Sequence, residues 1–168
     1  EATGRAIDSA GGITNQFTGD GVMALFGVYD GAAAGARHAL LAAREMTRAV
    51  ERLSQELRTE LPAPLRMGIG IHCGSTVVGH MGRGVATYLT AVGDAVNTAS
   101  RLQDQTKHFA CQLIISETVA ERAGMDPSRF RREELSVRNR DAPIAVRIIE
   151  NVEDLTAGES IPAAGTGA

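Results

Sequence analysis

Residues 88–102 read YLTAVGDAVNTASRL, and this stretch is the strongest local signal of the fold because it joins a predicted strand directly to a predicted helix. Its first five residues are aromatic, apolar or β-branched, which predicts a strand over residues 86–92. Beyond Gly93, small and apolar residues recur at helical spacing and predict a helix over residues 95–105. Asp94 is well suited to cap the N-terminus of this helix.

Two polar side chains of the predicted helix share one face. Asn97 and Arg101 are four residues apart, so both project from the same side. An amide and a guanidinium that project together can grip a phosphoryl or ribose oxygen, and a guanidinium does so with two hydrogen bonds. The alternative is a solvated polar face with ordinary hydrogen bonds, and this segment taken alone favours the alternative.

A second informative segment is FTGDGVMALFG at residues 17–27. Two short β-prone runs surround Gly-Asp-Gly, which predicts a hairpin, because glycine tolerates the positive φ of a tight turn. Asp20 at the tip would expose its carboxylate beside closely approaching backbone, which suits a hard cation and a phosphate. The alternative is that Asp20 only satisfies the turn, since Gly-Asp-Gly is ordinary turn chemistry.

The order of the remaining elements indicates an α+β fold with hairpins rather than a doubly wound parallel sheet. A long amphipathic helix is predicted over residues 32–61, ended by Pro62 and Pro64. The other predicted elements are a helix over 2–10, β-prone runs over 65–72 and 75–79, strands over 112–116, 129–137 and 142–149, and a short helix over 117–123. From Asn151 onward the composition predicts a flexible tail over residues 151–168 with nothing to bury.

Composition narrows the function classes. A chain of 168 residues with 43% apolar and 22% charged residues fits one globular domain. Its net charge of −3 argues against bulk binding to nucleic acid, and no apolar run is long enough to cross a membrane. Cys73 and Cys111 occur in apolar contexts typical of buried, reduced thiols in a cytosolic protein. The four scattered histidines do not have zinc-site spacing.

The basic side chains are sixteen arginines and one lysine, and several arginines gather near the C-terminus. They are Arg129, Arg131, Arg132, Arg138 and Arg140. Such a run is most often a solvated strand edge that is protected against pairing. The functional alternative is a cationic wall for a polyphosphate.

Taken together, these segments resemble the class III adenylyl/guanylyl cyclase catalytic domain. The resemblance is carried by residues 17–27, by RMGIGIHCG at 66–74 with VVGHMG at 77–82, and above all by residues 88–102. It spans roughly residues 1–150 and implies a ferredoxin-like βαββαβ core. In that core a central, mostly antiparallel sheet has helices packed on it.

The resemblance also implies roles for single residues. Asp20 matches the second of two metal-binding aspartates, for two Mg²⁺ or Mn²⁺ ions per site. Asn97 and Arg101 match the pair that orients the ribose and stabilises charge on the α-phosphate. Arg140 falls where such enzymes usually place a lysine for the terminal phosphates. The implied reaction is the in-line attack of the ribose 3′-hydroxyl on the α-phosphorus, with release of pyrophosphate.

Gln16 and Thr90 fall at the two base-reading positions of the family. A glutamine amide presents either its oxygen or its nitrogen, so Gln16 does not decide between adenine and guanine. Thr90 resembles a subgroup that is commonest among adenylyl cyclases, which makes ATP the expected substrate and GTP the alternative. In this family the metal half and the base-reading half of each site come from different protomers, so a cytoplasmic homodimer with composite sites is expected.

One departure from the family pattern concerns the metal site. The family's first metal aspartate lies about forty residues before the Gly-Asp hairpin, and Asp8 in the opening helix is not a match. The sheet is then expected to lack a central strand, so the catalytic domain over residues 1–150 is expected to be N-terminally incomplete. A fragment of a longer enzyme and a degenerate, non-catalytic module that dimerises and regulates both remain open.

Overall fold

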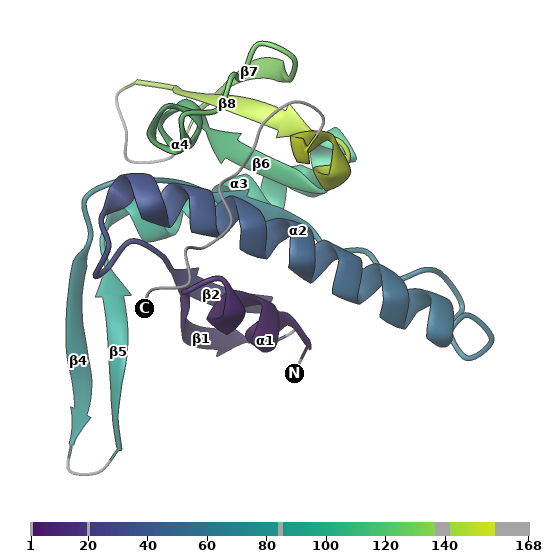
Figure 1. Cartoon of the computed structure of the whole chain (residues 1–168), viewed down its shortest axis with the longest axis horizontal. Coiled ribbons are helices and arrows are strands. Elements are labelled where there is room, and N and C mark those ends of the chain that lie inside the picture. Colours follow the sequence, from purple (N-terminus) through teal and green to yellow (C-terminus); the bar gives the residue numbers. More distant parts are fainter. Residues whose placement is uncertain (1, 20, 84–85, 137–141, 157–168) are drawn as a thin grey trace, which may run out of the picture.

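The computed structural model describes residues 2–19, 21–83, 86–136 and 142–156. Figure 1 shows the whole chain in ribbon form. The elements in chain order are α1 (Ala2–Ser9), β1 (Ile13–Thr18), β2 (Gly21–Leu25), α2 (Ala32–Glu56), β3 (Ile69–Ile71), β4 (Val77–Arg83), β5 (Ala86–Val92), α3 (Asp94–Phe109), β6 (Leu113–Ser116), α4 (Glu117–Ala123), β7 (Arg131–Leu135), β8 (Ile144–Ile149) and the 3₁₀ helix η1 (Val152–Thr156).

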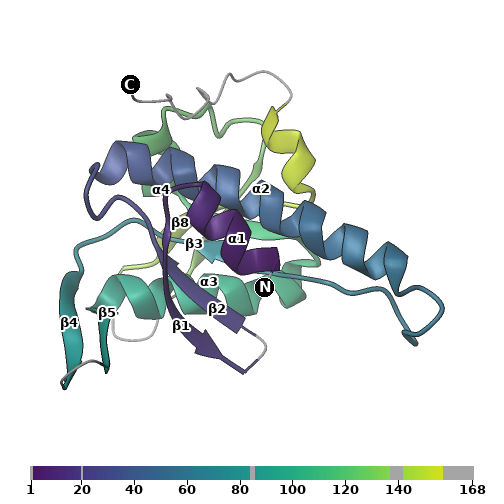
Figure 2. The ribbon, with the colours of Figure 1, turned by 60° about the horizontal axis from the view of Figure 1, so that its bottom comes forward.

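The strands form one four-stranded sheet and two separate hairpins. The sheet has the order β3-β6-β8-β7, in which β3 pairs parallel to β6 and the other two pairings are antiparallel. The hairpin β1–β2 lies beside α1, and the hairpin β4–β5 projects as an arm from the body (Figure 1 and Figure 2). The predicted α+β class and the mostly antiparallel central sheet are therefore confirmed.

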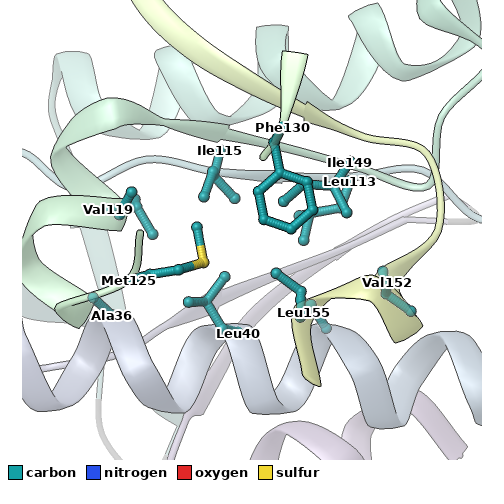
Figure 3. Packing of buried hydrophobic residues seen from close by; sticks show 12 residues of the cluster. Ala36, Leu40, Leu113, Ile115, Val119, Met125, Phe130, Ile149, Val152 and Leu155 are labelled. Atoms are coloured by element: carbon teal, nitrogen blue, oxygen red, sulfur yellow. The ribbon is translucent and has the colours of Figure 1, made fainter. Parts of the chain in front are cut away.

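The core is built around β6, whose four residues are all fully buried. Side chains alternate between the two faces of a strand, so Leu113 and Ile115 point to one face and Ile114 to the other. Leu113 and Ile115 pack with residues of α2, α4 and η1, as Figure 3 shows. Ile114 packs with Leu102 of α3 and residues of β8. The sheet therefore has α2 on one face and α3 on the other.

The C-terminal end of the body differs from the sequence prediction. Their composition predicts that residues 152–156 belong to the flexible tail, but they form η1. Val152 is 1% exposed and Leu155 is 3% exposed, and both pack into the core beside α2 (Figure 3). A pair of apolar residues three apart is enough to hold one 3₁₀ turn against the core, and composition averaged over the segment obscures such a pair. Residues 157–168 lie outside the described part of the chain.

Several element boundaries also differ from prediction. α2 ends at Glu56, before the prolines, because Leu57 already leaves helical geometry. β3 covers only residues 69–71, and α3 runs four residues further than expected, to Phe109. Asp94 is the first residue of α3 rather than its cap; the capping residue is Gly93, without a side-chain cap hydrogen bond. An acidic residue in the first turn still favours the helix through the helix dipole.

Two arginines of the predicted run lie on a charged strand edge. Arg131 and Arg132 lie on β7, which is an edge strand of the sheet. Arg131 pairs with Glu133, and Arg132 pairs with Glu134 at 3.1 Å. These two arginines are therefore engaged with neighbouring carboxylates on the outer edge, as the protective interpretation expects. Arg138 lies outside the described residues.

The C-terminus of α3 offers a stability prediction. Its C-cap residue, Ala110, has φ 50° and ψ 42°, the left-handed conformation that glycine adopts without the steric penalty of a Cβ. We expect Ala110→Gly to raise the free energy of unfolding by about 1 kcal/mol, as measured by urea denaturation. A decrease in stability would show that the left-handed conformation is not adopted in solution.

A second prediction concerns an ion pair between α4 and β8. Arg147 donates hydrogen bonds to Glu117 and to the carbonyl oxygen of Phe130, the latter at 3.1 Å. The hydrogen bond from Arg147 lowers the pKa of the Glu117 carboxyl. Because the pKa is lower in the folded state, the pair stabilises the fold above the ordinary glutamate pKa and is lost as the pH falls through the folded-state pKa. We therefore expect the Tm difference between wild type and Glu117→Gln to shrink below roughly pH 4; a pH-independent difference would contradict this.

Candidate active site

The helix α3 presents the two predicted catalytic side chains on its outer face. Asn97 is exposed and Arg101 is half-buried. They are separated by one helical turn, so their Cβ atoms lie roughly 6 Å apart. Within the described part of the chain, neither side chain has a hydrogen-bond or ion-pair partner. Both are therefore available to a ligand approaching this face of α3.

The strand β5 places Thr90 next to this helix. β5 ends at Val92, and only Gly93 separates it from α3. Thr90 is half-buried and pairs with Gly79 of β4, and it shares a strand face with the exposed Val92. The strand-to-helix connection predicted from residues 88–102 therefore brings Thr90, Asn97 and Arg101 into one continuous segment.

The hairpin β1–β2 contacts β5 through a side chain that the sequence analysis did not single out. The Asn15 amide donates a hydrogen bond of 2.8 Å to the carbonyl oxygen of Leu89, 74 positions away in the sequence. This bond joins the residue before Gln16 to the residue before Thr90. The two predicted base-reading positions therefore lie on strands of different hairpins that contact each other. Nothing in the sequence distinguishes Asn15 from other polar strand residues, because its partner is a backbone atom far along the chain.

The other two predicted site residues are Asp20 and Arg140. Asp20 lies at the β1–β2 connection and Arg140 between β7 and β8, and both lie outside the described residues. Among the residues that are described, no group of three or more histidine, cysteine or carboxylate side chains could hold a metal ion. The described part of the chain therefore does not form a complete metal site.

A large cavity separates the hairpin β1–β2 from the main sheet. Its volume is about 800 Å³, and it is bordered by β2 on one side and β3 on the other. Small residues of the two helices also line the cavity. They include Gly35 and Ala39 of α2 and Ala99 of α3. In the described residues β2 pairs only with β1, and β3 pairs only with β6. The cavity therefore lies between two strand edges that do not pair with each other.

These features define an α+β domain that presents an amide and a guanidinium from one helix beside a glycine-flanked hairpin. A family model described as the adenylate and guanylate cyclase catalytic domain matches residues 10–149. The chain therefore belongs to the adenylate and guanylate cyclase catalytic domain family.

Sequence relatives agree with this assignment. The chain is 36% identical over 148 residues to an adenylate cyclase of Anabaena cylindrica, which covers 85% of this chain and 29% of the relative. It is 37% identical over 108 residues to adenylate cyclase 1 of Rhizobium meliloti, which covers 62% of this chain and 16% of the relative. The chain thus spans less than a third of the length of these relatives.

Solved structures share the fold. The guanylyl cyclase Cya2 superposes with a TM-score of 0.75 at 28% identity, covering 88% of this chain and 74% of that chain. The adenylyl cyclase CyaB from P. aeruginosa has a TM-score of 0.72 at 23% identity, covering 89% and 77%, and supports the fold alone. In the described residues, no helix combines the length and the apolar character that a membrane span requires.

Proposed function

We propose that this chain is the catalytic domain of an adenylate cyclase that acts in intracellular signalling, in the cytoplasm, where ATP is available. The observation that carries the proposal is the pair Asn97 and Arg101 on one face of α3, directly continuous with Thr90, in a chain of this family. Neither side chain has a partner among the described residues. An exposed amide and a half-buried guanidinium one helical turn apart suit a ribose and a phosphoryl group that are covalently linked.

The proposed reaction converts ATP to 3′,5′-cyclic AMP and pyrophosphate. The 3′-oxygen forms a bond to the α-phosphorus, the bond from that phosphorus to the bridging oxygen of the β-phosphate breaks, and the hydroxyl proton leaves to solvent. Asn97 orients the ribose so that its 3′-oxygen is in line. Arg101 donates hydrogen bonds to the α-phosphoryl oxygens, where negative charge accumulates in the transition state. Arg140 is proposed to bind the terminal phosphates.

We propose Mg²⁺ or Mn²⁺, two ions per site, as the metals, with Asp20 as one ligand. Divalent ions bound there neutralise triphosphate charge and lower the pKa of the attacking hydroxyl. We propose that a second carboxylate completes the site with Asp20, because the described residues contain no group that could hold a metal ion. Asp20→Ala is expected to abolish metal-dependent turnover, because it removes one of the carboxylates proposed to hold the ions.

The cavity between β2 and β3 is the proposed position of an additional strand that supplies this carboxylate. Both bordering strands have a free edge in the described structure, and the small side chains of α2 and α3 leave room on both faces. In the full-length protein, the amides of β2 and β3 that face the cavity are then protected from hydrogen exchange. Fast exchange at Gly70, whose N–H points away from β6, would contradict an inserted strand.

We propose that the protein acts as a homodimer with composite sites. The arm β4–β5 has an apolar cross-strand pair, Val77 and Val92, which are 75% and 60% exposed on the face that also carries Thr90. An exposed apolar patch beside a site is typical of an interface. If Asp20 and Arg101 serve one site from different protomers, an equimolar mixture of Asp20→Ala and Arg101→Ala regains about a quarter of wild-type activity, since a mixed dimer has one intact site. A fully inactive mixture of folded, exchanging dimers would contradict this arrangement.

The proposed substrate is ATP, supported by Thr90 and by the adenylate cyclases among the relatives. GTP is the second candidate, because Cya2 is a guanylyl cyclase and the Gln16 amide has both a donor and an acceptor, so it can hydrogen-bond to adenine or to guanine. The test is a comparison of kcat/KM for ATP and GTP, with Mn²⁺ and Mg²⁺, using the full-length protein. A higher kcat/KM for ATP is expected, and a clear preference for GTP would refute the choice.

Asn15 gives a prediction for the base-reading positions. Asn15→Ala removes the hydrogen bond that ties β1 to Leu89 of β5. We expect kcat/KM for ATP to fall roughly tenfold, the equivalent of one lost hydrogen bond, and the ratio of ATP to GTP turnover to change with it. Thr76→Ala is the control, since it removes only an exposed local bond to Gly74. An unchanged substrate ratio and unchanged kcat/KM in Asn15→Ala would show that this link does not position the two residues.

A further inference from the structure

Two glycines bring β3 unusually close to α3. Gly68 immediately precedes β3 and Gly70 is its central residue, so both face the same side of the extended chain. That side packs against α3 (Figure 2). At both positions a Cβ atom would collide with α3, although neither glycine has the positive φ that requires the residue for conformational reasons. The glycines are therefore needed for the close approach of two elements.

The contact at Gly70 is with the backbone of α3. A Cβ at this position would lie 2.3 Å from both the Ala99 carbonyl oxygen and the Gln103 nitrogen. No rotamer change can relieve a collision with main-chain atoms. To restore ordinary van der Waals distances, α3 would have to move away from β3 by roughly 1 Å.

The contact at Gly68 is with a side chain. A Cβ there would lie 1.9 Å from the Thr106 Oγ1 and 2.9 Å from its Cβ. Thr106 is 2% exposed, and its hydroxyl donates a hydrogen bond of 2.6 Å to the Gln103 carbonyl oxygen, so it has little freedom to turn away. Unlike the contact at Gly70, most of this collision disappears if the threonine is shortened.

The face of α3 that rests on Gly70 is opposite the face that carries the site. Ala99 follows Asn97 by two residues and Gln103 follows Arg101 by two, and two residues correspond to roughly 200° around an α-helix. Moving α3 away from Gly70 therefore moves Asn97 and Arg101 outward along the direction in which they project. A shift of roughly 1 Å in catalytic groups is enough to lower a rate about 100-fold.

We propose that Gly68 and Gly70 are positioning residues: the absence of their side chains sets the depth at which α3 lies on β3 and hence the place of Asn97 and Arg101. This inference rests on the proposed function for its effect on turnover. The distance at which α3 packs on β3 does not depend on that function.

The test compares Gly70→Ala, Gly68→Ala, Thr106→Ala and the double variant Gly68→Ala/Thr106→Ala in the full-length protein. Kinetics are measured with ATP and expressed per folded molecule. In Gly70→Ala we expect kcat to fall about 100-fold with a much smaller change in KM, because Arg101 acts mainly in the transition state. Gly68→Ala is expected to lose at least tenfold in kcat, and Thr106→Ala is expected to restore most of this loss in the double variant.

The matched control is Leu155→Ala, which removes a buried side chain on the opposite face of the sheet, against α2. It is expected to lower the Tm without lowering kcat per folded molecule. If Leu155→Ala lowers kcat as much as Gly70→Ala, the glycines have only a structural role and the proposal is wrong. Failure of Thr106→Ala to restore Gly68→Ala would also overturn it.

A readout independent of activity separates this proposal from the proposed function. In amide NMR spectra, Gly70→Ala is expected to shift resonances throughout α3 and to leave α4 unchanged. Unchanged α3 resonances in folded Gly70→Ala would overturn the positioning role. A folded wild-type protein without cyclase activity would instead overturn the proposed function. The spectra would still show whether Gly70 determines the position of α3 on β3.

Discussion

Arg101→Ala is expected to lower turnover at least ~100-fold while leaving the protein folded, the size of effect seen when one preorganised donor to a developing oxyanion is removed. The side chain is half-buried on α3 and has no partner among the described residues, so its removal breaks no contact of the fold. The loss therefore falls on the transition state, and kcat is expected to decrease more than KM increases. Cyclic AMP formation under saturating ATP measures this directly.

Two further variants make the Arg101 prediction specific. Arg101→Lys keeps the positive charge but loses the planar, bidentate geometry, so intermediate turnover is expected. Arg58→Ala removes an exposed arginine just beyond α2 and is expected to leave turnover unchanged. Near-normal turnover in folded Arg101→Ala would exclude the proposed catalytic role of this residue.

Leu113→Ala is the substitution for which we expect the largest loss of stability. Leu113 is fully buried on β6, between β3 and β8, and packs with residues of α2, α4 and η1 (Figure 3). Shortening a leucine in such a site removes apolar burial and leaves a cavity, which costs about 3 kcal/mol. Because single domains are stable by only about 5–15 kcal/mol, the midpoint of urea denaturation should fall markedly.

The control for Leu113 is Leu53→Ala on the exposed side of α2. Leu53 is 40% exposed, and alanine is a good helix former, so a change below about 1 kcal/mol is expected. Equal losses in the two variants would contradict the assignment of β6 as the centre of the core.

The order and type of the elements were predictable where the chain has strong local signals. The step from β5 into α3 follows from Gly93 between a β-prone run and a helical run, so the elements that carry Thr90, Asn97 and Arg101 were predictable. The hairpin β1–β2 likewise follows from its glycines. In these cases the determining residues are neighbours in the sequence.

Features that depend on distant partners were not predictable from the sequence. Asn15 bonds to a carbonyl oxygen 74 positions away, and Gly70 is required by the backbone of a helix about thirty residues further on. The burial of Val152 and Leu155 depends on α2, which begins more than a hundred residues earlier. Composition and periodicity report a residue's own preferences, whereas these roles arise from which segments meet in the fold.

The proposed activity of the domain is the cyclisation of ATP. Its most direct test is to incubate the full-length protein with ATP and Mg²⁺ or Mn²⁺ and to follow the products by ³¹P NMR, with Arg101→Ala as the reference for background. We predict cyclic AMP and pyrophosphate in equal amounts, both strongly reduced in the variant. Release of ADP and phosphate, or no cyclic nucleotide from the folded wild-type protein, would contradict the proposed cyclase activity.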